Sequence, residues 1–245
     1  MRTPILLALL VAVAPAAADT VAIGAKKDAS IYKENTDFGN AIGGGIFAGN
    51  NNANWARRAL LSFDVAASVP AGSTITGVSL TLRCTRSHAG SFAMDLHRLS
   101  GDWGEFFADT GANPGGSGVP AGPGDATWFE RFFQQGASWT TAGGDFSPNV
   151  TSSTNVSVSG VSYTWPTSAR FVADVQSMLD NPGANFGWIL LGNETTTQSS
   201  KRFASREYSV TSQRPSLSVT YTTVPAPGAL ALLAPVVLAG ARRRR

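Results

Sequence analysis

The chain has 245 residues, with 19 Lys and Arg side chains against 16 Asp and Glu, and a formal net charge of +3 at pH 7. Five of the arginines lie in the terminal segments, at Arg2 and Arg242–Arg245, so 14 basic side chains face 16 acidic ones between them. That balance excludes the strongly basic surface that nucleic-acid binding requires. The single cysteine, Cys84, excludes an internal disulfide.

Residues 1–18 are typical of a secretory signal peptide. Arg2 gives the positive start, residues 5–14 form an apolar run, and Ala16–Ala18 supply the small side chains of a cleavage site. The apolar run is shorter than the roughly 20 residues of a membrane span. The pattern predicts export.

Residues 225–245 form a second terminal signal. The apolar stretch Gly228–Ala241, interrupted only by Pro235, is followed by Arg242–Arg245. The arginines predict that this end stays on the cytoplasmic side of a membrane. A disordered basic tail that binds an acidic partner is the alternative, but it would leave the apolar stretch exposed, which is costly.

Between the two signals, residues 19–224 are long enough for one domain with its own core. In Val78–Thr85, apolar side chains alternate with polar ones, which predicts a half-buried strand with Cys84 on its buried face. Trp188–Leu191 is apolar throughout, as expected of a strand covered on both faces. The alternating pattern recurs in Leu61/Phe63/Val65, Phe92/Met94/Leu96, Val156/Val158, Val161/Tyr163/Trp165 and Leu217/Val219/Tyr221.

One short helix is predicted near residues 168–179. Apolar side chains recur there at helical spacing, Ser168 is a suitable N-cap, and Asn181-Pro182-Gly183 ends the segment. Many strands with one helix predict an all-β protein, an antiparallel β-sandwich of the jelly-roll type. The Gly- and Pro-rich stretch Gly111–Gly124 is predicted to be a loop inserted into this single domain.

Several segments, taken in order, resemble those of DNRLRE domains. Examples are Asp28-Ala29-Ser30-Ile31-Tyr32, Arg58–Asp64, Asp102-Trp103-Gly104-Glu105 and Ser205-Arg206-Glu207. The resemblance covers nearly all of residues 19–221 and implies an extracellular, non-catalytic β-sandwich. Some members of that family are carbohydrate-binding modules for acidic polysaccharides such as alginate. The resemblance therefore implies a uronate-rich extracellular polysaccharide as the partner.

The tail resembles the sorting signal of PEP-CTERM proteins. The resemblance rests on Val224-Pro225-Ala226-Pro227, the apolar stretch and the terminal arginines, with Ala226 where that family has glutamate. It implies that an exosortase-type enzyme processes the tail and that the tail contacts the membrane. It also implies the surface of a Gram-negative bacterium, associated with the outer membrane or the extracellular matrix.

Sugar binding needs an aromatic face for the apolar side of a pyranose ring, with polar groups at its rim. Trp55 lies in a polar stretch and is the main candidate, while Trp128 and Trp139 lie near loop boundaries. Arg57 and Lys33 are candidates to bind a uronate carboxylate. Packing of Trp55 against a neighbouring loop explains its position equally well.

A catalytic alternative rests on Asp102 and Glu105, which flank Trp103. A polysaccharide lyase or glycoside hydrolase could use such a pair, because glycosidase carboxylates lie about 5–10 Å apart. The sequence favours instead a core position for Trp103, with Glu105 either capping a backbone segment or pairing with an arginine. His88 and His97 are expected to face solvent, and no serine or cysteine lies in a nucleophile elbow, so no catalytic residues are predicted.

Structural ion pairs are expected beside the core strands. Arg58 and Arg206 lie in short segments next to such strands, and one of them is expected to pair with Glu207 or Asp64. The physical reason is that a buried charge without a partner is costly.

Oxygen-rich stretches around residues 28–37 and 50–54 could hold a structural Ca²⁺ ion, which prefers oxygen ligands. Asp28 and Asp37 are the candidate ligands. The sequence has no spaced acidic motif that would strengthen this hypothesis, and it predicts no other metal or cofactor.

These observations lead to one hypothesis and two alternatives. The hypothesis is an exported, surface-anchored, non-catalytic module that binds or organises extracellular polysaccharide or forms part of the surface matrix. The first alternative is a lyase or hydrolase that uses Asp102 and Glu105. The second is a purely structural component of the surface coat.

Overall fold

The computed structural model describes residues 17–88, 90–111 and 116–223. The predicted signal peptide (1–18) and the predicted tail (225–245) therefore lie outside the described residues, apart from Ala17 and Ala18. Within the described ranges, no helix combines the length and the apolar character needed to cross a membrane.

Strands dominate the part of the chain that the structure describes. They are β1 (Ala18–Tyr32), β2 (Phe38–Asn40), β3 (Gly45–Asn50), β4 (Ala56–Phe63), β5 (Thr74–Ser87), β6 (Phe92–Leu99), β7 (Val119–Pro120), β8 (Glu130–Phe132), β9 (Ala137–Ser138), β10 (Phe146–Val156), β11 (Val161–Trp165), β12 (Trp188–Leu191), β13 (Lys201–Ala204) and β14 (Ser216–Thr222). The helical elements are α1 (Val65–Ser68), α2 (Ala169–Asp180) and the short 3-10 turns Pro182–Ala184 and Thr211–Gln213.

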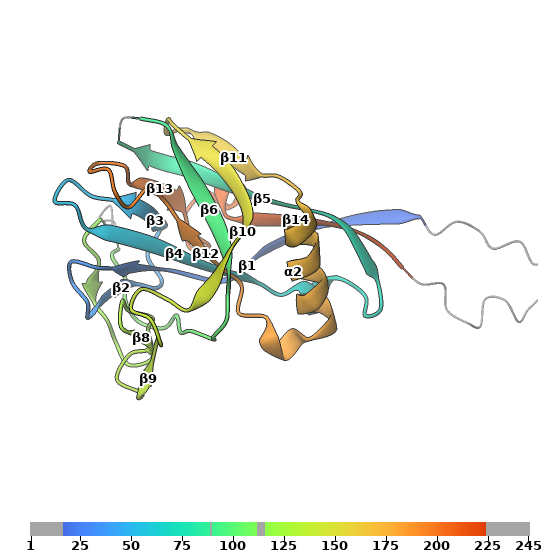
Figure 1. Ribbon diagram of the computed structural model, residues 1–245, viewed down its shortest axis with the longest axis horizontal. Coiled ribbons are helices and arrows are strands. Elements are labelled where there is room, and N and C mark those ends of the chain that lie inside the picture. Colours follow the sequence, from blue (N-terminus) through green and yellow to red (C-terminus); the bar gives the residue numbers. More distant parts are fainter. Residues whose placement is uncertain (1–16, 89, 112–115, 224–245) are drawn as a thin grey trace, which may run out of the picture.

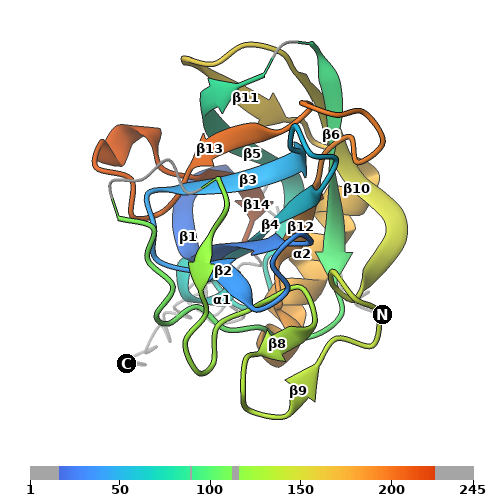
Figure 2. The ribbon, with the colours of Figure 1, turned by 90° about the vertical axis from the view of Figure 1, so that its left-hand side faces the viewer.

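Twelve of the strands form two antiparallel layers that share strands (Figures 1 and 2). In the first layer, β14 lies between β1 and β5, and β5 also pairs with β11 and β13, which in turn pairs with β3. In the second layer, the order is β10-β6-β12-β4-β1-β2-β7. Strand β1 belongs to both layers, because its register shifts between Ala25 and Lys27. The predicted all-β, jelly-roll-like sandwich is confirmed.

The main core fills the space between the two layers. Alternation in β5 directs Val78, Leu80, Leu82 and Cys84 into this core, as the period-two pattern predicts. Trp165 and Trp188, both predicted to be core residues, are completely buried there.

Helix α2 completes the main core and confirms the predicted helix. The hydroxyl of Ser168 accepts a hydrogen bond from the backbone N–H of Phe171 at 2.9 Å, which is the N-cap contact expected from the sequence. Phe171, Val175 and Met178 lie three or four residues apart and are buried in the core. The helix packs against β5, toward the end of the molecule where β1 begins and β14 ends (Figure 1).

Two predicted strands end earlier than their apolar patterns suggest. Strand β4 stops at Phe63 because Asp64 caps α1, accepting a hydrogen bond from the N–H of Ala67, so Val65 is buried as part of a helix. Strand β10 ends at Val156, and Val158 is exposed.

A second core lies on the outer face of the second layer. In β4, Leu61 and Phe63 face the main core while Leu60 faces outward, and in β12 Ile189 faces outward between two inward residues. Residues 100–111 and 116–145 cover this outer face, with β8 and β9 below β2 in Figure 2. The cluster contains Ala29, Ile31, Ala56, Leu60, Leu99, Trp103, Ala126, Trp128, Trp139 and Ile189.

The two cores predict that neighbouring residues of β4 contribute similarly to stability. Leu60→Ala should lower the free energy of unfolding by about 2–5 kcal/mol, as a buried leucine does. Leu61→Ala, on the main-core face, is the matched comparison, and chemical denaturation measures both. A loss within about 0.5 kcal/mol for Leu60→Ala, typical of a surface site, would contradict the second core.

Candidate functional site

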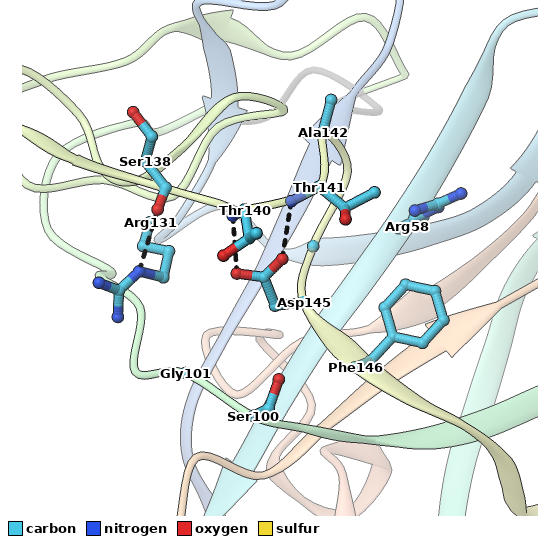
Figure 3. Close-up of a pocket in the computed structure, with 11 residues that line it drawn as sticks. Arg58, Ser100, Gly101, Arg131, Ser138, Thr140, Thr141, Ala142, Asp145 and Phe146 are labelled. Carbon is cyan, nitrogen blue, oxygen red and sulfur yellow. Dashed lines mark hydrogen bonds between the residues drawn. The ribbon is translucent and has the colours of Figure 1, made fainter.

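An open groove of about 680 Å³ lies at the edge of the second core (Figure 3). Its walls come from four segments: β4, the residues after β6, the β8–β9 hairpin and the turn that precedes β10. The lining is mainly polar, with Phe146 as its aromatic side chain and with Arg58 and Arg131 as its two cations.

The turn before β10 is held in place by Asp145. Its carboxylate accepts hydrogen bonds from the backbone N–H groups of Thr140 and Thr141, both at 2.8 Å (Figure 3). The charge of Asp145 is therefore used within the turn, while the side chains of Thr140 and Thr141 remain exposed in the groove. This geometry presents hydroxyl groups to a ligand on a fixed backbone.

Arg58 is fully engaged at the base of the groove. Its Nε and Nη2 atoms donate to the two carboxylate oxygens of Glu194 at 2.7 and 2.8 Å, and Nη1 donates to the carbonyl of Gly143 at 2.8 Å. The guanidinium also lies over the ring of Trp128, 4.8 Å from its centroid. Position 143 has a positive φ of 91°, and a Cβ there would lie 2.7 Å from the Trp128 ring, so this packing requires glycine.

Arg131 is the more available cation. Its Nε donates to the carbonyl of Ser138 and its Nη1 to the carbonyl of Asp102, both at 3.3 Å. Throughout the described ranges, no carboxylate lies within ion-pair distance of Arg131. A half-buried guanidinium with spare donors suits an incoming carboxylate.

Two of the tryptophans proposed for sugar binding lie inside the protein. Trp128 and Trp139 are each 5% exposed and belong to the second core, and Trp139 donates from Nε1 to the carbonyl of Thr127. Neither ring presents a face to solvent. Proximity to loop boundaries misled the interpretation, because these loops fold onto an apolar sheet face.

Trp55 has a different environment, in the turn between β3 and β4. Its ring is 43% exposed, and Asn51 fixes the turn by accepting hydrogen bonds from the N–H groups of Ala53 and Trp55. Lys33, which is exposed, lies on the adjacent strand end, since its N–H donates to the carbonyl of Ala56. The structure thus brings Trp55 and Lys33 to the same end of the sandwich.

Arg57 does not share this exposure. Its side chain is buried and its Nη2 pairs with Glu34 at 2.5 Å, while the guanidinium lies over the ring of Tyr32. The charge of Arg57 is therefore neutralised inside the protein rather than presented to a uronate.

The two carboxylates of the catalytic alternative are engaged by different cations. Asp102 pairs with Lys27 at 2.6 Å, and Glu105 pairs with Arg206 at 2.9 Å. Trp103 between them is completely buried, with Lys27 also over its ring. The pair therefore does not face a common open space, as a glycosidase pair must.

Glu105 belongs instead to a carboxylate cluster with Asp28 and Glu207. One oxygen of each lies within 4.8 Å of the others. Arg206 contacts two of the three, with its Nε 2.9 Å from Glu105 and 2.8 Å from Glu207, while its backbone N–H donates to Asp28. Of the residues predicted to form structural ion pairs, the structure thus brings Arg206 and Glu207 together. Asp64 pairs with Lys26 instead.

Burial is the main cause of the raised pKa values of the three carboxylates in this cluster. It raises the pKa of Asp28 well above its usual range, and the nearby Glu207 and Glu105 carboxylates raise it further. Burial raises the pKa of Glu105 to about 7, against the opposing effect of Arg206, and it also raises the pKa of Glu207. Of the two Ca²⁺ candidates from the sequence, Asp28 is in this cluster and Asp37 is exposed elsewhere.

The histidines differ from the expectation that both face solvent. His97 is buried, because its ring packs against Phe146 and its Nδ1 lies 2.9 Å from the carbonyl oxygen of Ser147. His88 is exposed at the end of β5.

The sequence analysis missed Arg131, Phe146 and Glu194. Arg131 lies in the aromatic-rich segment Phe129–Phe133, a pattern that also suits packed structure. Glu194 follows β12 by three residues and lies 136 residues from its partner Arg58. Only the fold shows that Arg131 and Phe146 share one groove with Arg58, and that Glu194 is the ion-pair partner of Arg58.

The raised pKa of Glu105 predicts a pH-dependent stability. Because folded Glu105 keeps its proton while the unfolded chain loses it, the stability of the fold should fall as pH rises from 4.5 to about 7. Glu105→Gln should make this decline shallower, since the neutral amide does not titrate. Melting temperatures over this pH range, with EDTA present, measure the difference. Identical slopes for the two proteins would contradict the assignment.

Comparison with known proteins adds no relative. No protein-family model matches the chain, and no curated protein matches it. The resemblance to DNRLRE domains and to PEP-CTERM tails stays a prediction from the sequence.

Proposed function

We propose that this protein is an exported, surface-anchored module that binds or organises an acidic extracellular polysaccharide and has no catalytic role of its own. The observation that carries the proposal is the groove in which Arg131 has no carboxylate partner among the described residues. A polymer of uronate residues offers carboxylates to such a cation and hydroxyls to the exposed threonines beside it.

The shape of the groove supports a polymer in preference to a small molecule. It is open to solvent, and it is lined by backbone and hydroxyl groups from several segments, some of which Figure 3 shows. Phe146 supplies an apolar surface against which a pyranose ring can lie.

Trp55 and Lys33 provide a second surface for the same kind of ligand. The exposed ring and the exposed ammonium lie on neighbouring strand ends, which is the combination required to stack on a sugar and bind its carboxylate. We assign the main contribution to the groove, because Arg131 there has spare donors and no carboxylate partner among the described residues.

Export and anchoring rest on the sequence of the two ends. The predicted signal peptide supports export, and the predicted tail supports processing by an exosortase-type enzyme, membrane contact and the surface of a Gram-negative bacterium. Ala18 pairs with Thr222, so any segments preceding and following the sandwich emerge together, which is compatible with an anchor at one end.

Removing the cation of the groove provides the test. Arg131→Ala should weaken binding to alginate by roughly tenfold or more, because it removes a charge-assisted hydrogen bond. The matched control is Arg170→Ala, which removes an exposed arginine on α2, outside the groove. Affinity gel electrophoresis with alginate and with neutral dextran measures retardation of each protein.

The outcomes separate the proposal from its alternatives. Equal loss in both variants would indicate a diffuse charge effect and contradict the groove. Absence of retardation by any acidic polymer would leave a structural surface-coat role. Release of reducing ends or unsaturated sugars by the purified protein would instead support the lyase or hydrolase that uses Asp102 and Glu105.

The second surface has its own expected outcome. Trp55→Ala should reduce retardation by alginate less than Arg131→Ala does, and should leave the melting temperature unchanged, because the ring is half-exposed. A larger loss from Trp55→Ala than from Arg131→Ala would reverse the assignment and make the turn between β3 and β4 the main binding surface.

A further inference from the structure

We infer that Asp28, Glu105 and Glu207 form a binding site for one divalent cation, with Ca²⁺ the ion that fits best. The three residues come from β1, from the segment after β6 and from the segment after β13, so they are 77 or more residues apart in the chain. The inference is independent of polysaccharide binding, because none of the three lines the groove.

The geometry of the cluster is the first support. One oxygen from each carboxylate lies within 4.8 Å of the other two. Ligands on opposite sides of a Ca²⁺ ion lie about 4.6–5.2 Å apart, since each Ca–O distance is about 2.3–2.6 Å. The three oxygens can therefore contact one such ion with little movement of the backbone.

Unpaired oxygens are the second, independent support. Asp28 is completely buried, and its Oδ1 has no hydrogen-bond partner among the described residues, although its Oδ2 accepts from the N–H of Arg206. The buried Oε2 of Glu207 is also without a partner there. Buried carboxylate oxygens are nearly always paired or bound to a metal. Two such oxygens in one cluster indicate that the cluster can bind a cation.

Charge balance is the third support. Arg206 contributes one positive charge through its contacts with Glu105 and Glu207. When a bound ion displaces the protons that burial favours, the three carboxylates carry three negative charges. The excess of two negative charges equals the charge of one divalent cation. Arg206 can remain in place in this arrangement, because its Nε contacts Oε1 of Glu207 while Oε2 has no hydrogen-bond partner among the described residues.

The ligand chemistry selects the ion. The cluster contains oxygen donors only, with no histidine or cysteine, which favours hard cations over Zn²⁺. Mg²⁺ requires near-ideal octahedral geometry and usually keeps several of its waters, so it suits a cluster of three protein carboxylates less well than Ca²⁺, which accepts irregular geometry.

A cation at this position would fasten residues 100–111 to the sandwich. Glu105 lies in the stretch that begins to cover the second core, and Asp28 and Glu207 belong to the two segments beneath it. Glu207 and Arg206 are partly exposed, so solvent ions can reach the cluster. The ion would then stabilise the cover of the second core.

The test titrates the EDTA-treated, purified protein with CaCl₂ in an isothermal calorimeter and follows its melting temperature. We expect one bound Ca²⁺ per chain, a raised melting temperature, and a weaker response to MgCl₂. Asp28→Asn should weaken Ca²⁺ binding by at least about tenfold, because the charge of the ligands sets the affinity. Asp37→Asn, which removes an exposed carboxylate outside the cluster, should bind as the wild type does.

Glu207→Gln covers the case in which Asp28→Asn does not fold, since Glu207 lies nearer the surface and its exchange leaves the buried backbone contacts intact. It should also lose Ca²⁺ binding. The inference is overturned if millimolar CaCl₂ gives neither heat nor a change in melting temperature. It is equally overturned if Asp28→Asn or Glu207→Gln responds as the wild type does, because the ion would then bind elsewhere.

Discussion

Strand β4 has apolar side chains on both of its faces. The need to shield the second of these faces from water determines how the rest of the chain is arranged around it. Leu61 and Phe63 fill the space between the layers, as in any sandwich. Leu60, with Ile189 from the neighbouring strand, faces the other way and would lie in water without a cover. Residues 100–111 and 116–145 supply that cover with three tryptophans, and their path creates both the groove and the position of Glu105.

The sequence predicted those parts of the fold that depend on local periodicity. Strand β5 and helix α2 follow from alternation in Val78–Cys84 and from helical spacing after Ser168, because each buries one face. Strand β1 was not predicted as a strand, since lysines and Asp28 interrupt its alternation where it passes from one layer to the other. Its pairing depends on partners distant in sequence.

The sites were harder to predict because their members meet only through the fold. Trp128 resembled a surface aromatic, but the face of β4 beneath it is apolar and Arg58 covers its ring. Asp28 was a candidate ligand on the strength of neighbouring oxygens, whereas its actual partners, Glu105 and Glu207, come from segments far along the chain. Local composition therefore indicated that position 28 could be a metal ligand, but it could not indicate which other residues lie beside it.

The pairing of Ala18 with Thr222 has a mechanical consequence. Both ends of the described chain lie at one pole of the molecule, and the antiparallel hydrogen bonds between β1 and β14 run perpendicular to the strands (Figure 1). A force that separates the two ends therefore acts along those bonds and opens them one after another, like a zipper. A force between Thr222 and the turn at the opposite pole acts instead along the strands, where many bonds share the load. The sandwich therefore resists tension between Thr222 and its opposite pole better than tension between its own two ends.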